Sequence, residues 1–144
     1  MSREQQVADF LARWAVSFDE LCLAFRETLA PDGVWDQRPI PRLTGPDAAV
    51  RFLKFSRRTM GLDTIEVEVV RIAASGDVVF VERIDRLRLR GGGEIAAAAV
   101  TGVFEFRGDK IAYWREYFDA SSFVAGAARR GVGLLGSRLA RLAR

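Results

Sequence analysis

The second half of the chain contains four runs rich in β-branched and aromatic residues, with short glycine-containing turns between them. The runs are "TIEVEVVRIAA", "DVVFVERIDRLRLR", "EIAAAAVTGVFEFR" and "KIAYWREYF", and the turns are "SGD", "GGG" and "GDK". Strand-like runs joined by such turns are typical of β-hairpins. The pattern therefore predicts an antiparallel meander, in which each strand pairs with the next.

The first half of the chain predicts helices. Two capping boxes, "SREQ" at Ser2 and "SFDE" at Ser17, begin segments with apolar residues at helical spacing. The segment "APDG" is expected to end the second helix with a turn at Gly33, and "VWDQ" then predicts a short strand. A third helix is expected over Asp47 to Thr59. Helices followed by a meander indicate an α+β fold, with helices covering one face of a curved sheet and a pocket between the layers.

The composition limits the chemistry that this chain can perform. Histidine is absent and Cys22 is the single cysteine among 144 residues. The common Ser-His and Cys-His nucleophile pairs are therefore excluded, and so is a disulfide within the chain. If the protein is an enzyme, carboxylates are expected to transfer the protons. The N-terminus has no signal-peptide pattern and no apolar run approaches the ~20 residues of a membrane span, so a cytoplasmic protein is expected.

The positive charge is concentrated at the C-terminal end. Residues 124–144 contain five arginines and no acids, and because the net charge is +3, the rest carries about −2. We therefore expect one domain over residues 1–123, without nucleic-acid binding, and a basic tail over 124–144. The tail is predicted to be irregular over Ala125 to Gly133 and dispensable for chemistry. It could lie on an anionic membrane or an acidic partner, pack over the pocket or a partner subunit, or be disordered.

Three charged residues fall on strand faces that are otherwise apolar. Arg83 and Asp85 alternate with the apolar residues of one run, and Glu116 does so in the last run. Counting back from the turns places Arg83 opposite Val100, and Val100 opposite Glu116. The three side chains are then expected to approach each other inside the pocket. They could form a structural ion network, or they could bracket a small molecule.

The segments "ERIDRL", "TGVFEFRGDKIAYWREYFD" and "WDQRPIP" resemble the limonene-1,2-epoxide hydrolase family. The resemblance implies an NTF2-like or SnoaL-like cone, with a mostly antiparallel sheet of about six strands and three to four helices around a pocket. It also implies a catalytic triad of Arg83, Asp85 and Glu116. In that triad Glu116 would deprotonate water, Asp85 would protonate the epoxide oxygen and Arg83 would orient both acids, with neither metal nor cofactor.

The resemblance also implies further residues of the pocket. Family members hold the attacking water with a Tyr-x-Asn pair, and here the matching positions are Trp35 and Gln37. Gln37 can still donate and accept hydrogen bonds, whereas Trp35 can only donate one. The implied pocket-lining residues are Leu87, Ala98, Val100 and Phe123.

Alternative functions remain open from the sequence. An epoxide-opening or SnoaL-like cyclase on the same fold would use an internal hydroxyl group instead of water, and a non-catalytic protein would only bind a small molecule. A ketosteroid-isomerase-like enzyme is disfavoured, because Gln37 stands where such enzymes carry an acidic base. A homodimer is expected through the outer face of the sheet, which carries apolar residues at Phe80, Ile84, Ile111, Tyr113 and Tyr117.

Overall fold

The structure of the chain is a computed structural model that describes residues 1–38, 40–119, 121, 125, 128 and 129. Its helices are α1 (Arg3–Ala12), α2 (Phe18–Thr28) and α3 (Pro46–Met60), with a short 3₁₀ helix, η1 (Arg13–Ala15), after α1. Its strands are β1 (Leu29–Gln37), β2 (Leu43–Thr44), β3 (Leu62–Ser75), β4 (Val78–Leu89), β5 (Glu94–Arg107) and β6 (Lys110–Phe118).

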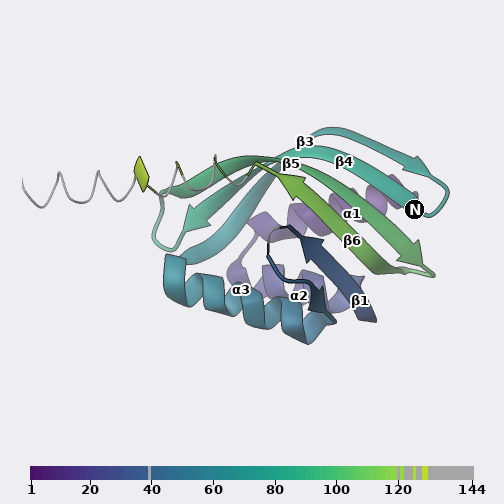
Figure 1. Cartoon of the computed structure of the whole chain (residues 1–144), viewed down its shortest axis with the longest axis horizontal. Helices are drawn as coiled ribbons and strands as arrows, with labels where there is room; N and C mark the ends of the chain where they lie inside the picture. The colour runs from purple at the N-terminus through teal and green to yellow at the C-terminus, as the bar shows by residue number, and fades with distance from the viewer. Residues whose placement is uncertain (39, 120, 122–124, 126–127, 130–144) are drawn as a thin grey trace, which may run out of the picture.

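The strands form one six-stranded sheet in the order β2-β1-β6-β5-β4-β3. The predicted meander is present, because β3, β4, β5 and β6 pair antiparallel in sequence order. The strand β1 joins the meander by pairing parallel to β6. The sheet is curved and remains open, and the helices lie on its concave side (Figure 1). The α+β fold with helices on one face of a curved sheet is therefore confirmed.

The two predicted capping boxes begin the first two helices. The hydroxyl oxygen of Ser2 accepts a hydrogen bond from the backbone N–H of Gln5, and that of Ser17 accepts one from Glu20. Such caps typically contribute about 1 kcal/mol each. The expected turn at Gly33 is wrong, because β1 starts directly after α2 and runs through this residue. A side chain at Gly33 would clash with the backbone oxygen of Ile111, 2.7 Å from the position of a Cβ, so glycine permits the close pairing of β1 with β6.

A β-bulge in β6 changes the faces of its first residues. Tyr113 pairs with Glu105 but Ile111 pairs with Phe106, so Ala112 is the extra residue. The side chain of Ile111 consequently lies in the core, fully buried, and its predicted place on the outer face is wrong. Glu116 lies opposite Gly102, two residues from the predicted Val100, and the bulge accounts for one of these two residues.

The core lies between the concave face and the helices. Its largest members are aromatic rings in mutual contact, and they come from all parts of the chain: Phe10, Trp14, Phe25, Trp35, Phe104 and Trp114. Trp35, Trp114 and Phe104 form a stack across β1, β6 and β5, with the first two rings 4.8 Å apart and nearly parallel. Within the described residues, no helix is long and apolar enough to cross a membrane.

Candidate active site

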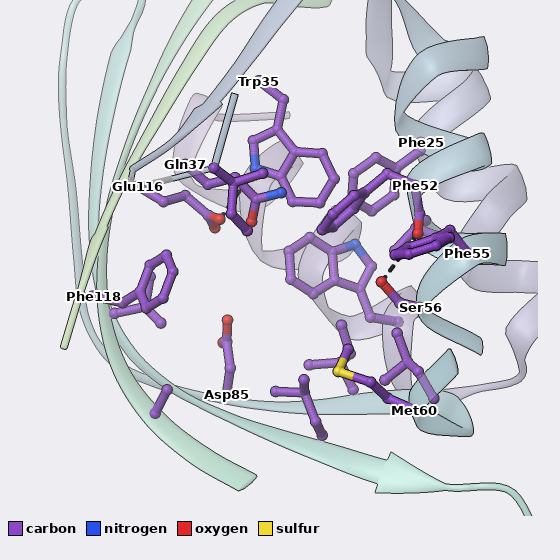
Figure 2. Close-up of a pocket in the computed structure, with 18 of the residues that line it drawn as sticks. Phe25, Trp35, Gln37, Phe52, Phe55, Ser56, Met60, Asp85, Glu116 and Phe118 are labelled. Atoms are coloured by element: carbon purple, nitrogen blue, oxygen red, sulfur yellow. Dashed lines mark hydrogen bonds between the residues drawn. The ribbon is translucent and has the colours of Figure 1, made fainter. Parts of the chain in front are cut away.

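A cavity of about 400 Å³ lies between the concave face and the helices. The sheet side contributes the acids Asp85 and Glu116 together with Gln37, and the helix side contributes aromatic and aliphatic groups (Figure 2). Among the described residues, the lining consists of Trp14, Phe25, Trp35, Gln37, Ile40, Phe52, Leu53, Phe55, Ser56, Thr59, Met60, Leu62, Ile65, Asp85, Leu87, Ala98, Val100, Glu116 and Phe118. An apolar pocket with a few convergent polar groups is the usual form of a small-molecule site.

Arg83 connects the two acids at the bottom of this cavity. Its Nε donates to Oδ1 of Asp85 at 2.8 Å, and its Nη2 donates to Oδ2 at 3.0 Å. The same Nη2 also donates to Oε1 of Glu116. All three residues are at least nine-tenths buried, and the guanidinium group is fully covered. The structure therefore brings together the three charged residues that the sequence pattern selected.

Burial governs the electrostatics of the group. Burial lowers the pKa of Arg83, but the carboxylates of Glu116 and Asp85 raise that pKa by more, so the guanidinium stays charged. Burial also raises the pKa of Glu116, and the charge of Asp85 adds to the increase. Arg83 and the Trp35 N–H act against this effect without cancelling it. Glu116 therefore holds a proton more strongly than an exposed glutamate does.

Trp35 contacts the triad directly. Its indole Nε1 donates to Oε2 of Glu116 at 3.1 Å, so that Arg83 and Trp35 each bind one oxygen of this carboxyl group. The pairing of Trp35 with Trp114 across β1 and β6 holds the indole in place by ring stacking. Trp35 thus positions Glu116, and its single N–H is already used.

Gln37 lies beside Glu116 on the neighbouring strand, and the two residues are direct partners in the β1–β6 ladder. Its side chain is buried, lines the cavity and points into it next to Glu116 (Figure 2). Its Nε2 has no hydrogen-bond partner among the described residues. A buried amide without a partner is costly, and a ligand or water that accepts a hydrogen bond here would remove that cost.

Leu87, Ala98 and Val100 line the cavity, whereas Phe123 lies outside the described residues. The described residues of the basic tail, 125, 128 and 129, are helical, so the irregular conformation predicted for Ala125 to Gly133 is wrong at these positions. The sequence did not predict the part of the wall formed by α3, which consists of Phe52, Leu53, Phe55, Ser56, Thr59 and Met60. The helical spacing of Phe52, Ser56 and Thr59 on one side of α3 is the signal that could have found this wall.

Asp36 illustrates how alternation separates the two faces of β1. It lies between Trp35 and Gln37 but faces away from the cavity, where it accepts hydrogen bonds from Tyr113 at 2.8 Å and from Arg42 at 3.1 Å. The Tyr113 hydroxyl lowers the pKa of Asp36, and the charges of Arg42 and Arg38 contribute. This buried carboxylate therefore stabilises the end of β1 from outside.

A metal site needs several ligand side chains close together. In the part of the chain that is described, no three Asp, Glu or Cys side chains are arranged to hold a metal ion. Cys22 is buried and is not a cavity residue.

Comparison with known protein families identifies the family of this chain. Residues 3–129 match the limonene-1,2-epoxide hydrolase catalytic domain. The chain belongs to the limonene-1,2-epoxide hydrolase family. A similar curated relative is the epoxide hydrolase EphG of Mycobacterium tuberculosis, which is 34% identical over 107 residues, or 74% of this chain and 68% of the relative.

Two solved structures are similar to the chain. An LEH-like epoxide hydrolase of M. tuberculosis matches with a TM-score of 0.72 and 30% identity, covering 94% of this chain and 96% of the other. A putative SnoaL-like polyketide cyclase of Shewanella denitrificans matches with a TM-score of 0.73 but only 13% identity, covering 88% and 97%. The second likeness is one of fold alone, and it confirms the NTF2-like and SnoaL-like architecture.

Proposed function

We propose that this protein is an epoxide hydrolase that adds water to a lipophilic epoxide in one step and releases a vicinal diol. The observation that carries the proposal is the Asp85–Arg83–Glu116 group at the polar side of an otherwise apolar cavity. Membership of the limonene-1,2-epoxide hydrolase family supports it. The apolar lining supports a lipophilic substrate.

The proposed reaction needs one acid and one base. Glu116 removes a proton from water while the water oxygen bonds to an epoxide carbon. Asp85, in its protonated form, gives its proton to the epoxide oxygen as the carbon–oxygen bond breaks. The proton gained by Glu116 then replaces the one lost by Asp85, so the site returns to its starting state. Arg83 orients both carboxyl groups, and the reaction needs neither a covalent ester nor a cofactor.

The charge balance of the site favours one proton shared between the two acids. One guanidinium and two carboxylates would leave a buried net charge of −1, whereas one added proton makes the group neutral. Neutral buried groups avoid the desolvation cost of an unpaired charge. A single proton shared between two acids is what a combined acid and base mechanism requires. The raised pKa of Glu116 also makes its carboxylate a stronger base than an exposed one.

Gln37 is proposed to hold the attacking water. Its unpartnered Nε2 donates to the water oxygen, while Glu116 accepts one of the water protons. Trp35 does not bind the water as the family's tyrosine does, because its N–H is bonded to Glu116. Instead, Trp35 fixes the side chain of Glu116, which is one methylene longer than an aspartate.

The test is a labelling experiment under single-turnover conditions. The protein, in excess over styrene oxide, cyclohexene oxide or limonene oxide, is mixed with isotopically labelled water, and the diol is analysed by mass spectrometry. Direct attack by water gives, in the first turnover, diol in which one of the two oxygens is labelled. Unlabelled first-turnover diol would reveal a covalent ester and contradict the mechanism, and the absence of any diol across a wider epoxide panel would contradict the function. The Glu116→Gln variant is the matched control.

One observation favours a second candidate, an epoxide-opening cyclase. Because Trp35 is bound to Glu116, the water has fewer protein partners than a tyrosine at this position would give it. A substrate that carries its own hydroxyl group would need no bound water. An epoxide with a hydroxyl group four or five carbons away distinguishes the two functions: the cyclase gives an unlabelled cyclic ether in labelled water, and the hydrolase gives a labelled triol.

The protein is further proposed to form a homodimer through the outer face of the sheet. The helices cover the concave face, while on the outer face Phe80 and Tyr117 are 48% and 52% exposed and Ile84 is half-buried. Large apolar side chains exposed on one face of a sheet are typical of an interface. Sedimentation at micromolar concentration should give twice the chain mass of 16.0 kDa, and a Phe80→Glu variant should shift towards the monomer. A wild-type monomer would contradict this assembly.

A further inference from the structure

Arg83 and Glu116 are in contact although a whole strand separates them. Arg83 is on β4 and Glu116 is on β6, and β5 lies between them. In the ladders, Arg83 pairs with Val100, whereas Glu116 pairs with Gly102, one inward-facing position further along β5. Strands two apart are separated by about 10 Å. The side chain of Arg83 must therefore cross the inner face of β5 diagonally, over Gly102.

Gly102 provides the space for this crossing. A Cβ at this position would lie 2.7 Å from Nη1 of Arg83 and 3.0 Å from Cε2 of Phe104. The first separation is much too short for a carbon and a guanidinium nitrogen. On the helix side, the ring of Trp14 lies 5.5 Å from the guanidinium carbon of Arg83. The guanidinium is thus enclosed between an indole ring and a strand that has no side chain at the point of contact.

The conformation of Gly102 gives no other reason for a glycine. Its φ is not among the positive values that occur at Gly45, Gly61 and the glycines of the hairpin turns. A glycine inside a strand weakens it, and alanine is normally the better residue at an extended position. Glycine at this point of a central strand instead indicates close approach of another group, which here is Arg83.

We propose that Gly102 is a positioning residue of the triad, because the space above its Cα lets Arg83 reach Glu116 while it remains bonded to Asp85. Both bonds to Asp85 join residues two apart on one strand, and they use Nε and Nη2. The bridge to Glu116 uses Nη2 alone. A side chain at position 102 therefore displaces the guanidinium from Glu116 first. Gly102 thus determines that the two acids share one cation.

The principal test is the Gly102→Ala variant. Turnover should fall about 100-fold, the size expected for a displacement of about 1 Å in an active site. The KM should change little, because Gly102 itself is not one of the residues that line the cavity. The pH midpoint of the acidic limb should move upward, because Arg83 is one of the groups that lower the pKa of Glu116. Ala99→Ser adds an atom on the exposed face of the same strand and is the matched control. It should change neither turnover nor the pH midpoint.

A second readout does not depend on turnover. The indole N–H of Trp35 is bonded to Glu116, so protonation of Glu116 should alter the tryptophan fluorescence. The fluorescence titration of Gly102→Ala should shift to higher pH, and the step should be absent in Glu116→Gln. The kinetic arm rests on the proposed function, but this titration does not. If the wild type opens no epoxide, the titration alone still decides the role of Gly102.

A double variant shows whether Gly102 is needed to make space for Arg83 or for another reason, such as the packing of β5. Lysine at position 83 keeps a positive charge but has no Nη1 to meet the new Cβ. Arg83→Lys with Gly102→Ala should therefore lose less turnover than the product of the two single losses. If Gly102→Ala does not fold, folding of the double variant supports the proposal, and failure of both overturns it. Wild-type turnover and an unshifted titration in Gly102→Ala also overturn it.

Discussion

The inner and outer faces of the sheet both carry ion pairs, but in opposite surroundings. On β4, Glu82 faces outward and bonds to Arg71 of β3, whereas the next residue, Arg83, faces inward and bonds to Asp85. The side chains of the outer pair are 78% and 52% exposed, and the guanidinium of Arg83 is fully buried. Alternation along one strand therefore places nearly identical chemistry in water and in the core.

The two faces differ in what their charges contribute. Exposed ion pairs contribute at most about 1 kcal/mol, because water screens them and the side chains lose entropy. Buried pairs lose hydration, and apolar residues of the same size are often equally stable. The outer pairs accordingly add little to stability, and stability also gives no reason to place three charges inside. The presence of these three charges is consistent with a chemical role.

Neutralising one inner acid should have the largest effect on activity. Asp85→Asn and Glu116→Gln preserve the volume of the side chain but remove its proton transfer, so turnover should fall by about 10²–10⁴-fold while the fold survives. Steady-state kinetics with the epoxide identified by the labelling experiment measures the loss. Glu82→Gln on the outer face is the control and should retain wild-type turnover. Near-normal activity in either inner variant would show that the triad assignment is wrong.

Removing the inner cation should destabilise the protein strongly. Arg83→Ala leaves Asp85 and Glu116 buried without their partner, and such losses cost about 3–5 kcal/mol. Chemical denaturation at neutral pH measures the change in the free energy of unfolding. The corresponding variant on the outer face, Arg71→Ala, should be much less affected. Equal losses in the two variants would remove the distinction between the faces.

The two faces should also respond to pH with opposite signs. Burial raises the pKa of Glu116, so the folded state holds its proton more tightly than the unfolded state. Its contribution to stability is present below the ordinary glutamate pKa of about 4.3 and is lost as pH rises through the raised value. A hydrogen bond from Arg88 lowers the pKa of Glu66 on the outer face, so its contribution is present above about pH 4.3 and is lost as pH falls.

The stabilities of the Glu116→Gln and Glu66→Gln variants are compared with that of wild type by thermal unfolding between about pH 3 and pH 8. Relative to wild type, Glu116→Gln should gain stability as the pH rises, and Glu66→Gln should lose it. The acidic limb of the turnover profile should also have its midpoint above the ordinary glutamate range, because Glu116 acts as a carboxylate. The same sign of change for both variants would contradict the assigned environments.

The smallest effect is expected within the outer face itself. A double-mutant cycle on Arg71 and Glu82, made in the Phe80→Glu background that disfavours the proposed dimer, should give a coupling energy of about 0.2–1 kcal/mol that decreases with added salt. The measurement uses denaturant unfolding of Phe80→Glu and of the two single variants and the double variant built on it. A larger, salt-independent coupling in this monomer would contradict the exposed surroundings of the pair.

The sequence predicted the composition of the site better than its geometry. Arg83, Asp85 and Glu116 stood out because charges interrupt an apolar alternation, and the position of Arg83 opposite Val100 followed from the turn. The partner of Glu116 was missed by two residues: one is due to the bulge at Ala112, which leaves no clear local pattern, and the other to the count from the turn. Gly102 was also missed, although a glycine between inward-facing apolar residues is a recognisable sign of close approach.

The limits on the fold prediction have similar causes. The caps at Ser2 and Ser17 are local, and they were found because side chain and backbone lie within one turn. The start of β1 was missed because Pro31 and Gly33 usually break a strand, and here they lie in an irregular stretch of β1 between Leu29, which pairs with Ile111, and Val34, which pairs with Tyr113. The cytoplasmic location, the need for no cofactor and the role of the basic tail stay predictions.

The place of β6 between β1 and β5 has a consequence for synthesis on the ribosome. The first strand to be synthesised, β1, cannot join the main sheet until the last strand is made, because among the described strands it pairs only with β6 and with the two-residue strand β2. Until β6 emerges, β1 and β5 both present unpaired backbone edges, which readily join the edges of other chains. The half-made protein is therefore the form most exposed to aggregation. Trp35 and Gln37 meet Glu116 only in that final step, so a nascent chain has no complete site before its sheet is complete.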